Sequence, residues 1–488
     1  MNQFFKHMGK REYIFLFILF CILFFGYQLR GFNEPDEGRY ASMGLNLLDP
    51  GVDLLEPILS GYGHYDKPPL IYWLTALVFK VFGKSEAAGR LTSLLAALSA
   101  LFGLGWAAWR LYGQRVAYLS ILICATLGQF WLLSRYLIPD IFLTSFICLA
   151  IGAWAEARHK NDHIGWWMLS ALFWILGWWA KATVVFIPLG GLILGCWLGK
   201  DWSGLKTLRP LRLSAVILLL GCPWYVWMIH KHPDLINFFL HREFVGRMTG
   251  HVDGRRGPLY YHLLVILIGW LPWWPIFLWK IFTHRRVTLH KKIWTQYLFT
   301  PEGIMVLLGI VIFSMISSKL PHYTLILAPW AALLMARYFV EQCSEVKNMF
   351  VEKAVLGFAI FTCLASIIIP QYESRLALNS SMREVAQELK KSGAEEVWMD
   401  RYWPGMEFYF GKRVIYFTDK VPTELPDETG FCKELGRSHF VSPEKMESLS
   451  KERKVVNVWL VHYRKQKLKN RALQAVKVVG DFELIPLH

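Results

Sequence analysis

Long apolar runs separated by short polar gaps dominate the first three quarters of the chain. A transmembrane helix needs roughly 20 apolar residues, and this pattern predicts a polytopic α-helical membrane protein with about 11–13 spans. The run that follows the basic start has no small-residue cleavage site after it, so we expect a retained span and not a cleaved signal. The eleven clearest segments are 12–30, 89–109, 116–134, 138–156, 164–180, 182–199, 210–229, 258–282, 302–317, 321–339 and 354–370.

Basic residues concentrate in alternate gaps between these runs. The basic gaps are the N-terminus, 110–115, 158–160, 200–212, 284–292 and 337–353. Positively charged short loops face the cytoplasm, so the remaining gaps are expected to face outward. The outward gaps are 31–88, 134–138, the junction at 181, 230–257, 317–322 and everything after 370.

Two outward segments are too long to be simple turns. Residues 31–88 contain helical patterns at about 36–48 and 68–83, which we expect to lie along the outer membrane surface. The tail from 371 alternates apolar and polar residues, and its segments 397–399 and 455–461 are typical of strands. We therefore expect a membrane domain over 1–370, with 31–88 as its first outer loop, and a soluble periplasmic α/β domain over 371–488.

Composition supports a protein embedded in lipid. The 488 residues are 54% hydrophobic and only 18% charged, and the mean hydropathy is +0.32. The formal net charge of +16 would suggest nucleic acid in a soluble protein. Here the basic residues lie between apolar runs, where they set topology, so no nucleic-acid partner is expected. Of the eight cysteines, only Cys432 lies in the tail, which excludes a disulfide within it.

A charged segment directly follows the first apolar run. Asp36 precedes Arg39 by three residues, which places both on one side of a short helix. A carboxylate at this position could act as a general base or orient a substrate, while the guanidinium keeps it ionised and binds phosphate. The structural alternative, that an acidic residue only stabilises the first turn of the helix, is the more common reason for such a pattern.

A second charged segment precedes two prolines. Pro68 and Pro69 keep the backbone before them out of the helical region and hold Lys67 beside Asp66. Lys67 could neutralise a phosphate leaving group, or it could form a surface ion pair worth little energy. His64 and Asp66 are also candidate ligands for a divalent metal, but two ligands without a third are a weak signal.

Further ionisable residues fall in the other outward gaps. Each one alone is explained by a side chain that reaches toward the headgroups, but ionisable groups at membrane depth are costly and usually functional. Several cations, few acids and many aromatic residues on one face suit a sugar linked to a lipid phosphate. No nucleotide-binding or serine-hydrolase motif is present. The residues are Arg135, Asp140, Lys181, His241, Arg242, Arg247, Lys319, His322 and Tyr323.

The order and spacing of these motifs resemble those of the lipid A 4-amino-4-deoxy-L-arabinose transferases. These enzymes are GT-C glycosyltransferases related to the dolichyl-phosphate-mannose protein mannosyltransferases. The resemblance covers roughly residues 1–340. It is carried by Asp-Glu-x-Arg-Tyr at 36–40, Asp-Lys-Pro-Pro at 66–69, Arg135 with Pro-Asp at 139–140, Trp-Trp-Ala-Lys at 178–181 and Ser-Lys-Leu-Pro-His-Tyr at 318–323.

The resemblance implies an inverting transfer from an undecaprenyl-phosphate sugar to a lipid A or other envelope acceptor. The reaction would occur on the periplasmic side of a bacterial inner membrane. By motif match, Asp36, Arg39 and Lys67 are the candidate catalytic residues. The substrate-binding candidates are Glu37, Tyr40, Asp66, Asp140, Lys181, Arg247, Lys319 and Tyr323.

Two features depart from the family pattern. Asp66 stands where family members often have Glu, so a divalent metal carried over from the family stays an open question, and no cofactor is assigned. The tail is shorter and more divergent, which leaves the sugar and the acceptor open. A protein O-mannosyltransferase or another envelope glycan transferase is the nearest alternative. A lipid transporter would place its ionisable groups at the bilayer midplane, and a scaffold would bind no lipid-linked sugar.

Overall fold

The structure is a computed structural model that divides into two compact units. It describes residues 9–60, 62–159, 163–246, 257–283, 297–342, 348–372, 381–411, 414–417, 440–441, 458–463, 477–479 and 481–486. Unit 1 comprises Met1–Tyr27, Arg90–Tyr225 and Phe244–Ile367, and unit 2 comprises Gln28–Gly89, Val226–Glu243 and Ile368–His488. Each unit is described by itself below.

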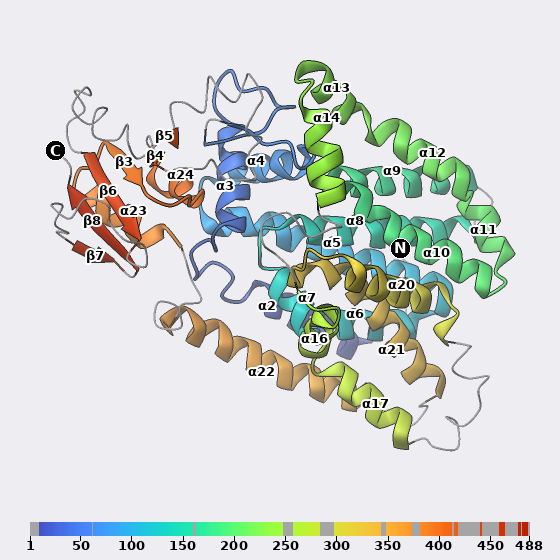
Figure 1. Ribbon diagram of the computed structural model, residues 1–488. Helices are drawn as coiled ribbons and strands as arrows, with labels where there is room; N and C mark the ends of the chain where they lie inside the picture. Colours follow the sequence, from blue (N-terminus) through green and yellow to red (C-terminus); the bar gives the residue numbers. More distant parts are fainter. Residues whose placement is uncertain are drawn as a thin grey trace. The chain divides into compact units, whose positions relative to one another are not determined.

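Unit 1 is built from helices, and every predicted apolar run is helical over most of its described residues (Figure 1). Helices α5, α13 and α22 each continue into unit 2 at one end. The polytopic helical fold class is therefore confirmed. The helices are α2 (Lys10–Phe24), α5 (Glu86–Tyr112), α6 (Gln114–Ala125), α7 (Gly128–Leu133), α8 (Pro139–Ala157), α9 (His163–Lys181), α10 (Phe186–Leu198), α11 (Trp202–Leu208), α12 (Pro210–Gly221), α13 (Pro223–Lys231), α16 (Tyr261–Gly269), α17 (Trp273–Thr283), α20 (Pro301–Met315), α21 (Ala328–Gln342) and α22 (Asn348–Tyr372), with 3-10 turns η1 (Ala182–Val185) and η3 (Pro321–Leu327).

Fewer helices than the predicted 11–13 are long and apolar enough to cross a membrane. Among the described residues there are six, or seven if the bent pair α16 and α17 forms one span, and three shorter apolar helices accompany them. The difference arises partly because the predicted runs 164–180 and 182–199 fall within one helical stretch, His163–Leu198, and partly because α6 and α20 are shorter than a span needs. The pair α16 and α17 bends by 88° around Pro272, since proline removes a backbone donor and ends the preceding helix.

Helix α8 lies at the centre of the packing in unit 1. In its apolar stretch 89% of the residues are buried within the protein, and α9 packs along it (Figure 1). Gly103 of α5 lets the two backbones approach, because an added Cβ would lie 2.5 Å from the carbonyl carbon of Cys148 in α8. Small residues at such crossings allow close helix packing in membrane proteins.

Buried ion pairs tie the helix ends of unit 1 together. Glu302 of α20 is 1% exposed and accepts hydrogen bonds from Tyr112 of α5 and Arg337 of α21, the latter at 3.1 Å. Arg110 of α5 pairs with the buried Glu156 of α8. A buried charge without a partner is strongly destabilising, so these pairs hold the ends of the four helices in place.

Unit 2 combines residues 28–89 with the segment 226–243 and the C-terminal tail. Its described helices are α3 (Asp36–Asn46), α4 (Leu70–Phe82), α14 (Leu235–Asn237), α23 (Arg383–Lys391) and α24 (Gly405–Phe410). The π-helical segment η2 (Phe238–Gly246) begins in this unit and continues into unit 1 after Glu243. A small hairpin is formed by β1 (Ile58–Leu59) and β2 (Tyr62–Gly63). The helices predicted at 36–48 and 68–83 are confirmed as α3 and α4. Their orientation along a membrane surface stays a prediction.

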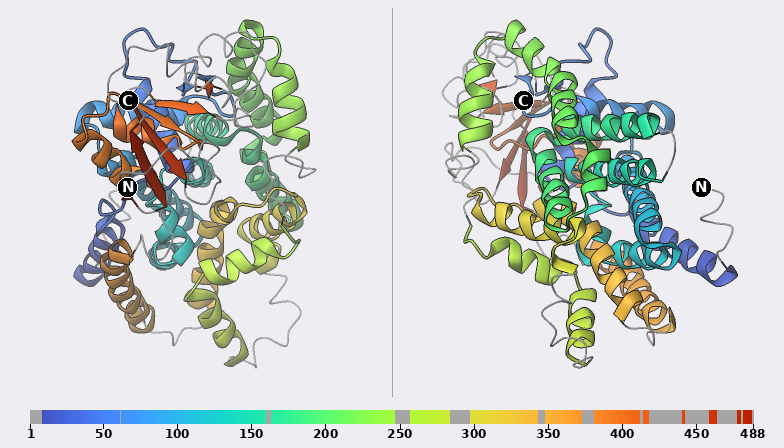
Figure 2. Two further views of the ribbon diagram at one scale, coloured as in Figure 1. Left: turned by 60° about the vertical axis from the view of Figure 1, so that its left-hand side comes forward. Right: turned by 90° about the vertical axis from the view of Figure 1, so that its right-hand side faces the viewer.

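The described residues of the tail form a six-stranded mixed sheet, drawn from orange to red in Figure 2. The strand order is β5–β4–β3–β6–β8–β7, with β3 parallel to β4 and β6, and β8 antiparallel to β6 and β7. The strands predicted at 397–399 and within 455–461 are confirmed, the second over its described residues. The strands are β3 (Glu396–Met399), β4 (Val414–Phe417), β5 (Phe440–Val441), β6 (Val458–Tyr463), β7 (Lys477–Val479) and β8 (Phe482–Pro486).

Two buried carboxyl groups lie where α24 packs against the first loop. Glu34 accepts a hydrogen bond from the backbone N–H of Gly405 at 3.2 Å, and a Cβ at Gly405 would clash with the Glu34 carboxyl group at 1.7 Å. Glu407 accepts from the backbone N–H of Ser60 at 3.2 Å. Burial raises the pKa of Glu34 to about 8 and that of Glu407 to about 7, because desolvation penalises the charged form.

The two raised pKa values predict that unit 2 loses stability as the pH rises from about 4.5 to about 8. The folded form binds these protons more tightly than the unfolded chain, whose carboxyls titrate near 4.5. Their contribution is therefore fully present below pH 4.5 and is lost as the pH rises to between 7 and 8. The slope is about 1.4 kcal/mol per pH unit for each carboxyl. Melting temperatures of the wild type and of Glu34→Gln/Glu407→Gln, measured from pH 5 to 8.5, should diverge as the pH rises. A constant difference would contradict the assignment.

The close approach of α5 and α8 predicts strong destabilisation by Gly103→Val. The added side chain would press on the α8 backbone, which has no flexible atom there to move aside. We expect a loss of about 1–3 kcal/mol, typical of overpacking, and a lower melting temperature of the purified protein. Gly357→Val in α22 is the matched control, because a Cβ at Gly357 meets nothing within 4 Å. Equal melting temperatures for the two variants would refute the close contact.

Candidate functional site

Helix α3 begins with the first predicted motif, and Glu37 fixes that beginning. The Glu37 side chain is fully buried and accepts a hydrogen bond from the backbone N–H of Asn33 at 3.0 Å. Arg30 donates to the same carboxyl group at 3.5 Å. A side chain in the first turn thus satisfies a backbone donor before the helix, which is one of the two bonds of a capping box. The structure thus gives Glu37 a capping contact, and its predicted contact with substrate stays a prediction.

Asp36 and Arg39 form an ion pair in the first turn of α3. The Asp36 side chain is 39% exposed, whereas that of Arg39 is 6% exposed. The guanidinium is therefore held in place by packing, while the carboxylate remains accessible to a substrate. This geometry agrees with the predicted pairing at a spacing of three residues.

Lys67 and His64 converge on Asp66 in the second motif. Lys67 Nζ lies 2.6 Å from one carboxylate oxygen of Asp66, and His64 Nδ1 lies 2.8 Å from the other. Burial alone would raise the pKa of Asp66, but His64 and Lys67 outweigh it and hold that pKa well below its usual range. Asp66 is thus ionised at neutral pH and keeps the ammonium group of Lys67 in a fixed position.

Tyr40 joins the two motifs of unit 2. The guanidinium carbon of Arg39 and the ammonium nitrogen of Lys67 each lie 5.6 Å from the centre of its ring. This distance is within the range of cation–π attraction. The ring also stacks on Tyr72 of α4 with 6.0 Å between centroids. Two fixed cations beside an aromatic wall, next to an accessible carboxylate, can bind the phosphate and sugar parts of one ligand.

Unit 1 contains a separate cluster around Asp140 at the start of α8. Lys181 Nζ lies 2.6 Å from one carboxylate oxygen of Asp140, and His322 Nε2 lies 3.7 Å from the other. That second oxygen is buried and accepts no hydrogen bond among the described residues. Lys181 Nζ also lies 4.4 Å from the centre of the Tyr323 ring. The cluster repeats the combination of a carboxylate, a cation and an aromatic ring.

The backbone at Lys181 explains how this side chain reaches Asp140. Helix α9 ends at Lys181, where the backbone leaves the helical region, and Ala182 follows with φ of +26°. Such a φ is strained for a residue with a side chain and persists only where the surroundings fix it. The break turns an apolar run of helix into two pieces and leaves the lysine at their junction.

Lys319 has a structural contact. Its amine donates hydrogen bonds to the backbone carbonyls of Phe313 and Ser314 at 2.8 and 2.6 Å. These are carbonyls at the end of α20, which lack partners within the helix. His262 of α16 contacts the same carbonyl of Phe313. Arg135 likewise binds the carbonyl of Leu23 and the hydroxyl of Ser366, and so holds α2 and α22. The binding role of Lys319 stays a prediction.

The remaining predicted residues do not join either cluster. Arg247 lies outside the described residues. His241 is exposed in η2. His64 and Asp66 contact each other, and no group of three His, Cys, Asp or Glu side chains that could hold a metal occurs in the described part of the chain.

Three polar residues of the structure had no substrate role in the sequence analysis. His64 and His322 stood beside the motifs but were given no substrate role. The third is Glu56, a buried carboxylate that accepts hydrogen bonds from Tyr65, Lys231 and His232. Nothing near Glu56 in the sequence signals this contact, because Lys231 and His232 are separated from it by more than 170 residues.

Comparison with known proteins identifies relatives of the predicted kind. The family model for dolichyl-phosphate-mannose-protein mannosyltransferase matches residues 66–227. An undecaprenyl phosphate-alpha-4-amino-4-deoxy-L-arabinose arabinosyl transferase of Erwinia tasmaniensis is 24% identical over 378 residues, which cover 74% of this chain and 66% of the relative. The enzyme of the same name from Yersinia enterocolitica is 26% identical over 69% of this chain and 61% of the relative. The chain thus spans somewhat less than two thirds of these relatives.

A solved structure supplies the comparison of folds. The crystal structure of ArnT from Cupriavidus metallidurans bound to undecaprenyl phosphate superposes with a TM-score of 0.76 and 17% sequence identity, and the match covers 97% of both chains. At this identity the likeness establishes the fold. The resemblance inferred from the motifs is therefore confirmed: this multi-span membrane protein is similar in sequence to the undecaprenyl-phosphate aminoarabinose transferases and shares the fold of ArnT.

Proposed function

We propose that this protein is an inverting glycosyltransferase that moves a sugar from undecaprenyl phosphate to lipid A or lipopolysaccharide. The donor sugar is 4-amino-4-deoxy-L-arabinose or a closely similar sugar. Support comes from the names of its relatives in Erwinia tasmaniensis and Yersinia enterocolitica and from a fold shared with a protein that binds undecaprenyl phosphate. The protein works in the bacterial inner membrane with its reacting groups and its domain 371–488 on the periplasmic side, which follows from the basic gaps on the opposite face.

The pairing of an accessible Asp36 with a buried Arg39 carries this proposal. In an inverting transfer the acceptor oxygen attacks the anomeric carbon from the side opposite the phosphate. The bond between that carbon and the phosphate oxygen then breaks, and its electron pair stays on the phosphate. Arg39 keeps Asp36 ionised, so Asp36 orients a cationic or hydroxyl group of the substrates. A phosphate acceptor needs no proton removed, whereas a hydroxyl acceptor would lose its proton to this carboxylate.

Lys67 is assigned to the departing phosphate. Its ammonium group is fixed by Asp66 at 2.6 Å and by the ring of Tyr40. A cation that is already in place stabilises the charge that develops on the leaving phosphate without reorganisation. The cluster in unit 1 has the same chemistry. We assign Lys181 and Tyr323 to donor contacts, and the second carboxylate oxygen of Asp140 to a hydrogen-bond donor on a substrate.

Removal of the Asp36 charge is expected to stop transfer. Asp36→Asn keeps the shape of the side chain but loses the ion pair with Arg39, and we expect a loss of at least about 100-fold in rate, within the range for a positioned catalytic carboxylate. Lipid A from a strain that depends on this protein, examined by mass spectrometry, should lack the added sugar. Asp49→Asn, an exposed carboxylate near the end of the same segment, should leave transfer intact. Normal transfer by Asp36→Asn in a protein that inserts normally would refute the assignment.

The role of Lys67 is tested in the same way. Lys67→Ala removes the proposed phosphate contact, so we expect a loss of about 100-fold or more in transfer, comparable to the loss of one preorganised electrostatic group. Lys67→Arg restores the charge and should recover part of the activity. Lys80→Ala is the control, since Lys80 is exposed on α4. Equal activity of the two alanine variants would exclude Lys67 from the reaction.

A second function is favoured by the match of residues 66–227 to the protein mannosyltransferase family. A protein O-mannosyltransferase would use the same donor chemistry but add the sugar to a protein hydroxyl. Mass spectrometry of lipid A and of envelope proteins from strains with and without the gene separates the two. A new mass on lipid A supports the first function, and a new mass on protein alone supports the second.

A further inference from the structure

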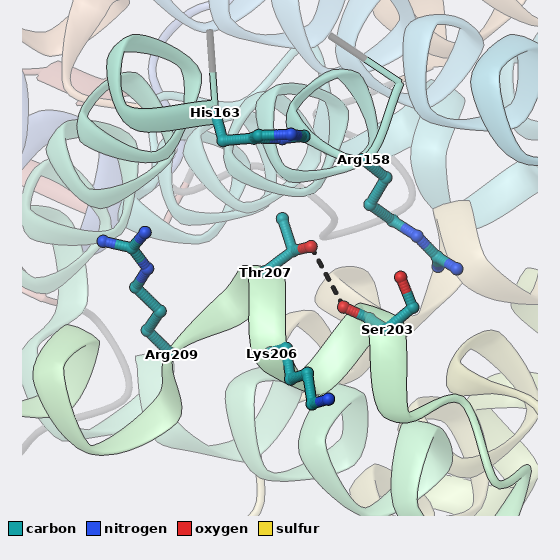
Figure 3. Close-up of a pocket in the computed structure, with 6 residues that line it drawn as sticks. All are labelled: Arg158, His163, Ser203, Lys206, Thr207 and Arg209. Atoms are coloured by element: carbon teal, nitrogen blue, oxygen red, sulfur yellow. Dashed lines mark hydrogen bonds between the residues drawn. The ribbon is translucent and has the colours of Figure 1, made fainter. Parts of the chain in front are cut away.

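A basic cavity in unit 1 shares no lining residue with either cluster described above. Its volume is about 460 Å³, and it is lined by Arg158, His163, Ser203, Lys206, Thr207 and Arg209 (Figure 3). Three of these side chains are permanent cations, two are hydroxyls and one is a histidine. Nothing in the proposed transfer reaction uses them.

The cavity lies at the opposite ends of α8 and α9 from the Asp140 cluster. Helix α8 begins with Pro139 and Asp140 and ends at Ala157, next to Arg158; α9 begins at His163 and ends at Lys181. Each helix has 19 residues, which at 1.5 Å per residue is roughly 28 Å. This is close to the thickness of the hydrocarbon core of a bilayer. The cavity and the Asp140 cluster therefore belong to opposite membrane edges.

Arg158 is held in a fixed position at one side of the cavity. Its guanidinium lies 5.0 Å from the centre of the Trp154 ring and pairs with Asp201, with 2.7 Å between Nη1 and Oδ2. Asp201 in turn caps α11 by accepting from the N–H of Gly204 at 3.0 Å. Because Asp201 compensates Arg158, the excess positive charge of the cavity comes from other residues.

Lys206 and Arg209 supply that excess charge from α11 and its end. Arg209 adopts φ of +50° between α11 and α12, and its guanidinium lies 5.7 Å from the Trp167 ring. Among the described residues neither side chain forms an ion pair with a carboxylate. The hydroxyl of Thr207 donates to the carbonyl of Ser203 at 3.0 Å (Figure 3). This bond fixes the hydroxyl oxygen in the cavity and leaves its lone pairs able to accept a hydrogen bond. Lysine and arginine together with hydroxyl groups are the usual partners of phosphate.

Large apolar side chains are exposed beside the cavity. Ile164 and Met168, which follow His163 on α9, are 50% and 61% exposed, and Trp202 and Leu211, which flank the α11 residues, are 53% and 88% exposed. Exposed apolar side chains at a membrane edge contact acyl chains, and tryptophan favours the headgroup level. A ligand whose phosphate enters the cavity can therefore keep acyl chains on this apolar rim.

We propose that this cavity binds the phosphate headgroup of an anionic membrane lipid at the membrane edge opposite the Asp140 cluster. Lys206 and Arg209 contact the phosphate, and the apolar rim contacts the chains. Basic pockets between helices at this level are suited to such headgroups. An anionic lipid differs from a zwitterionic lipid in its net negative charge. It differs from soluble phosphate in its acyl chains.

The test uses the full chain purified in a neutral detergent and native mass spectrometry. Phosphatidylglycerol and phosphatidylcholine of equal chain length are the lipid probes, and inorganic phosphate is the soluble probe. We expect the wild type to retain phosphatidylglycerol in preference to phosphatidylcholine. In Lys206→Gln/Arg209→Gln this preference should fall about tenfold, as expected for the loss of charge-assisted contacts to one phosphate.

The matched control is Lys200→Gln/Arg212→Gln, which removes the same charge from the same segment but from residues that do not line the cavity. It should retain the wild-type preference. Lys206→Gln alone changes an exposed side chain and should lower the preference about threefold with an unchanged melting temperature, which keeps the test valid if the double variant does not fold. Equal losses in the two double variants, equal retention of the two lipids, or full displacement of lipid by an equal concentration of inorganic phosphate would each overturn the proposal.

Discussion

The cost of placing charge in a low-dielectric interior governs unit 1. An ionised side chain there is tolerated only with a partner, and the buried carboxylates at the helix ends obey this rule. Glu156 pairs with Arg110, Glu302 with Arg337 and Glu352 with Arg11. Each pair joins two different helices, so the charges fix which helix ends meet, while the apolar residues between them provide packing without that selectivity.

Asp140 follows the same rule in part only. One oxygen is paired with Lys181, and the other is buried without a hydrogen bond among the described residues. A buried acceptor left in this state costs free energy, and it contrasts with Glu302, whose two oxygens both accept hydrogen bonds. A ligand that donates to this oxygen would recover the cost. The charge of Asp140 is therefore compensated by Lys181, but one of its two oxygens lacks a hydrogen-bond donor among the described residues. In this it differs from Glu302.

Some of this organisation could be read from the sequence and some could not. The period and length of the apolar runs predicted the helices, and the pattern at 397–399 predicted the strand β3, because both signals are local. The pairing of Asp36 with Arg39 was also local. The break at Lys181 was visible only as a lysine between apolar runs, since its backbone geometry depends on packing.

The roles of buried polar residues were the least predictable. Glu37 binds the backbone N–H of Asn33 before its own helix, and Lys319 binds the carbonyls at the end of α20. The sequence signalled neither contact, and the predicted substrate contacts of both residues stay predictions. Glu34 and Glu56 carry no sequence signal, because their partners are Gly405 and the segment at Lys231, far along the chain. Nonlocal contacts of this kind are decided by the fold. Arg247 and the residues that follow it to 256 lie outside the described part of the chain.

The burial of α8 has a consequence for how the protein is made. Its apolar stretch has a mean hydropathy of 1.5, high enough to cross a membrane, yet 89% of it faces protein and not lipid in the folded unit. Lipid-facing positions need apolar side chains permanently, but a helix surrounded by other helices does not. The hydrophobicity of α8 thus serves an early stage, when the newly inserted helix stands alone in the bilayer before its neighbours arrive. Biogenesis and final packing therefore impose separate demands on the same 19 residues.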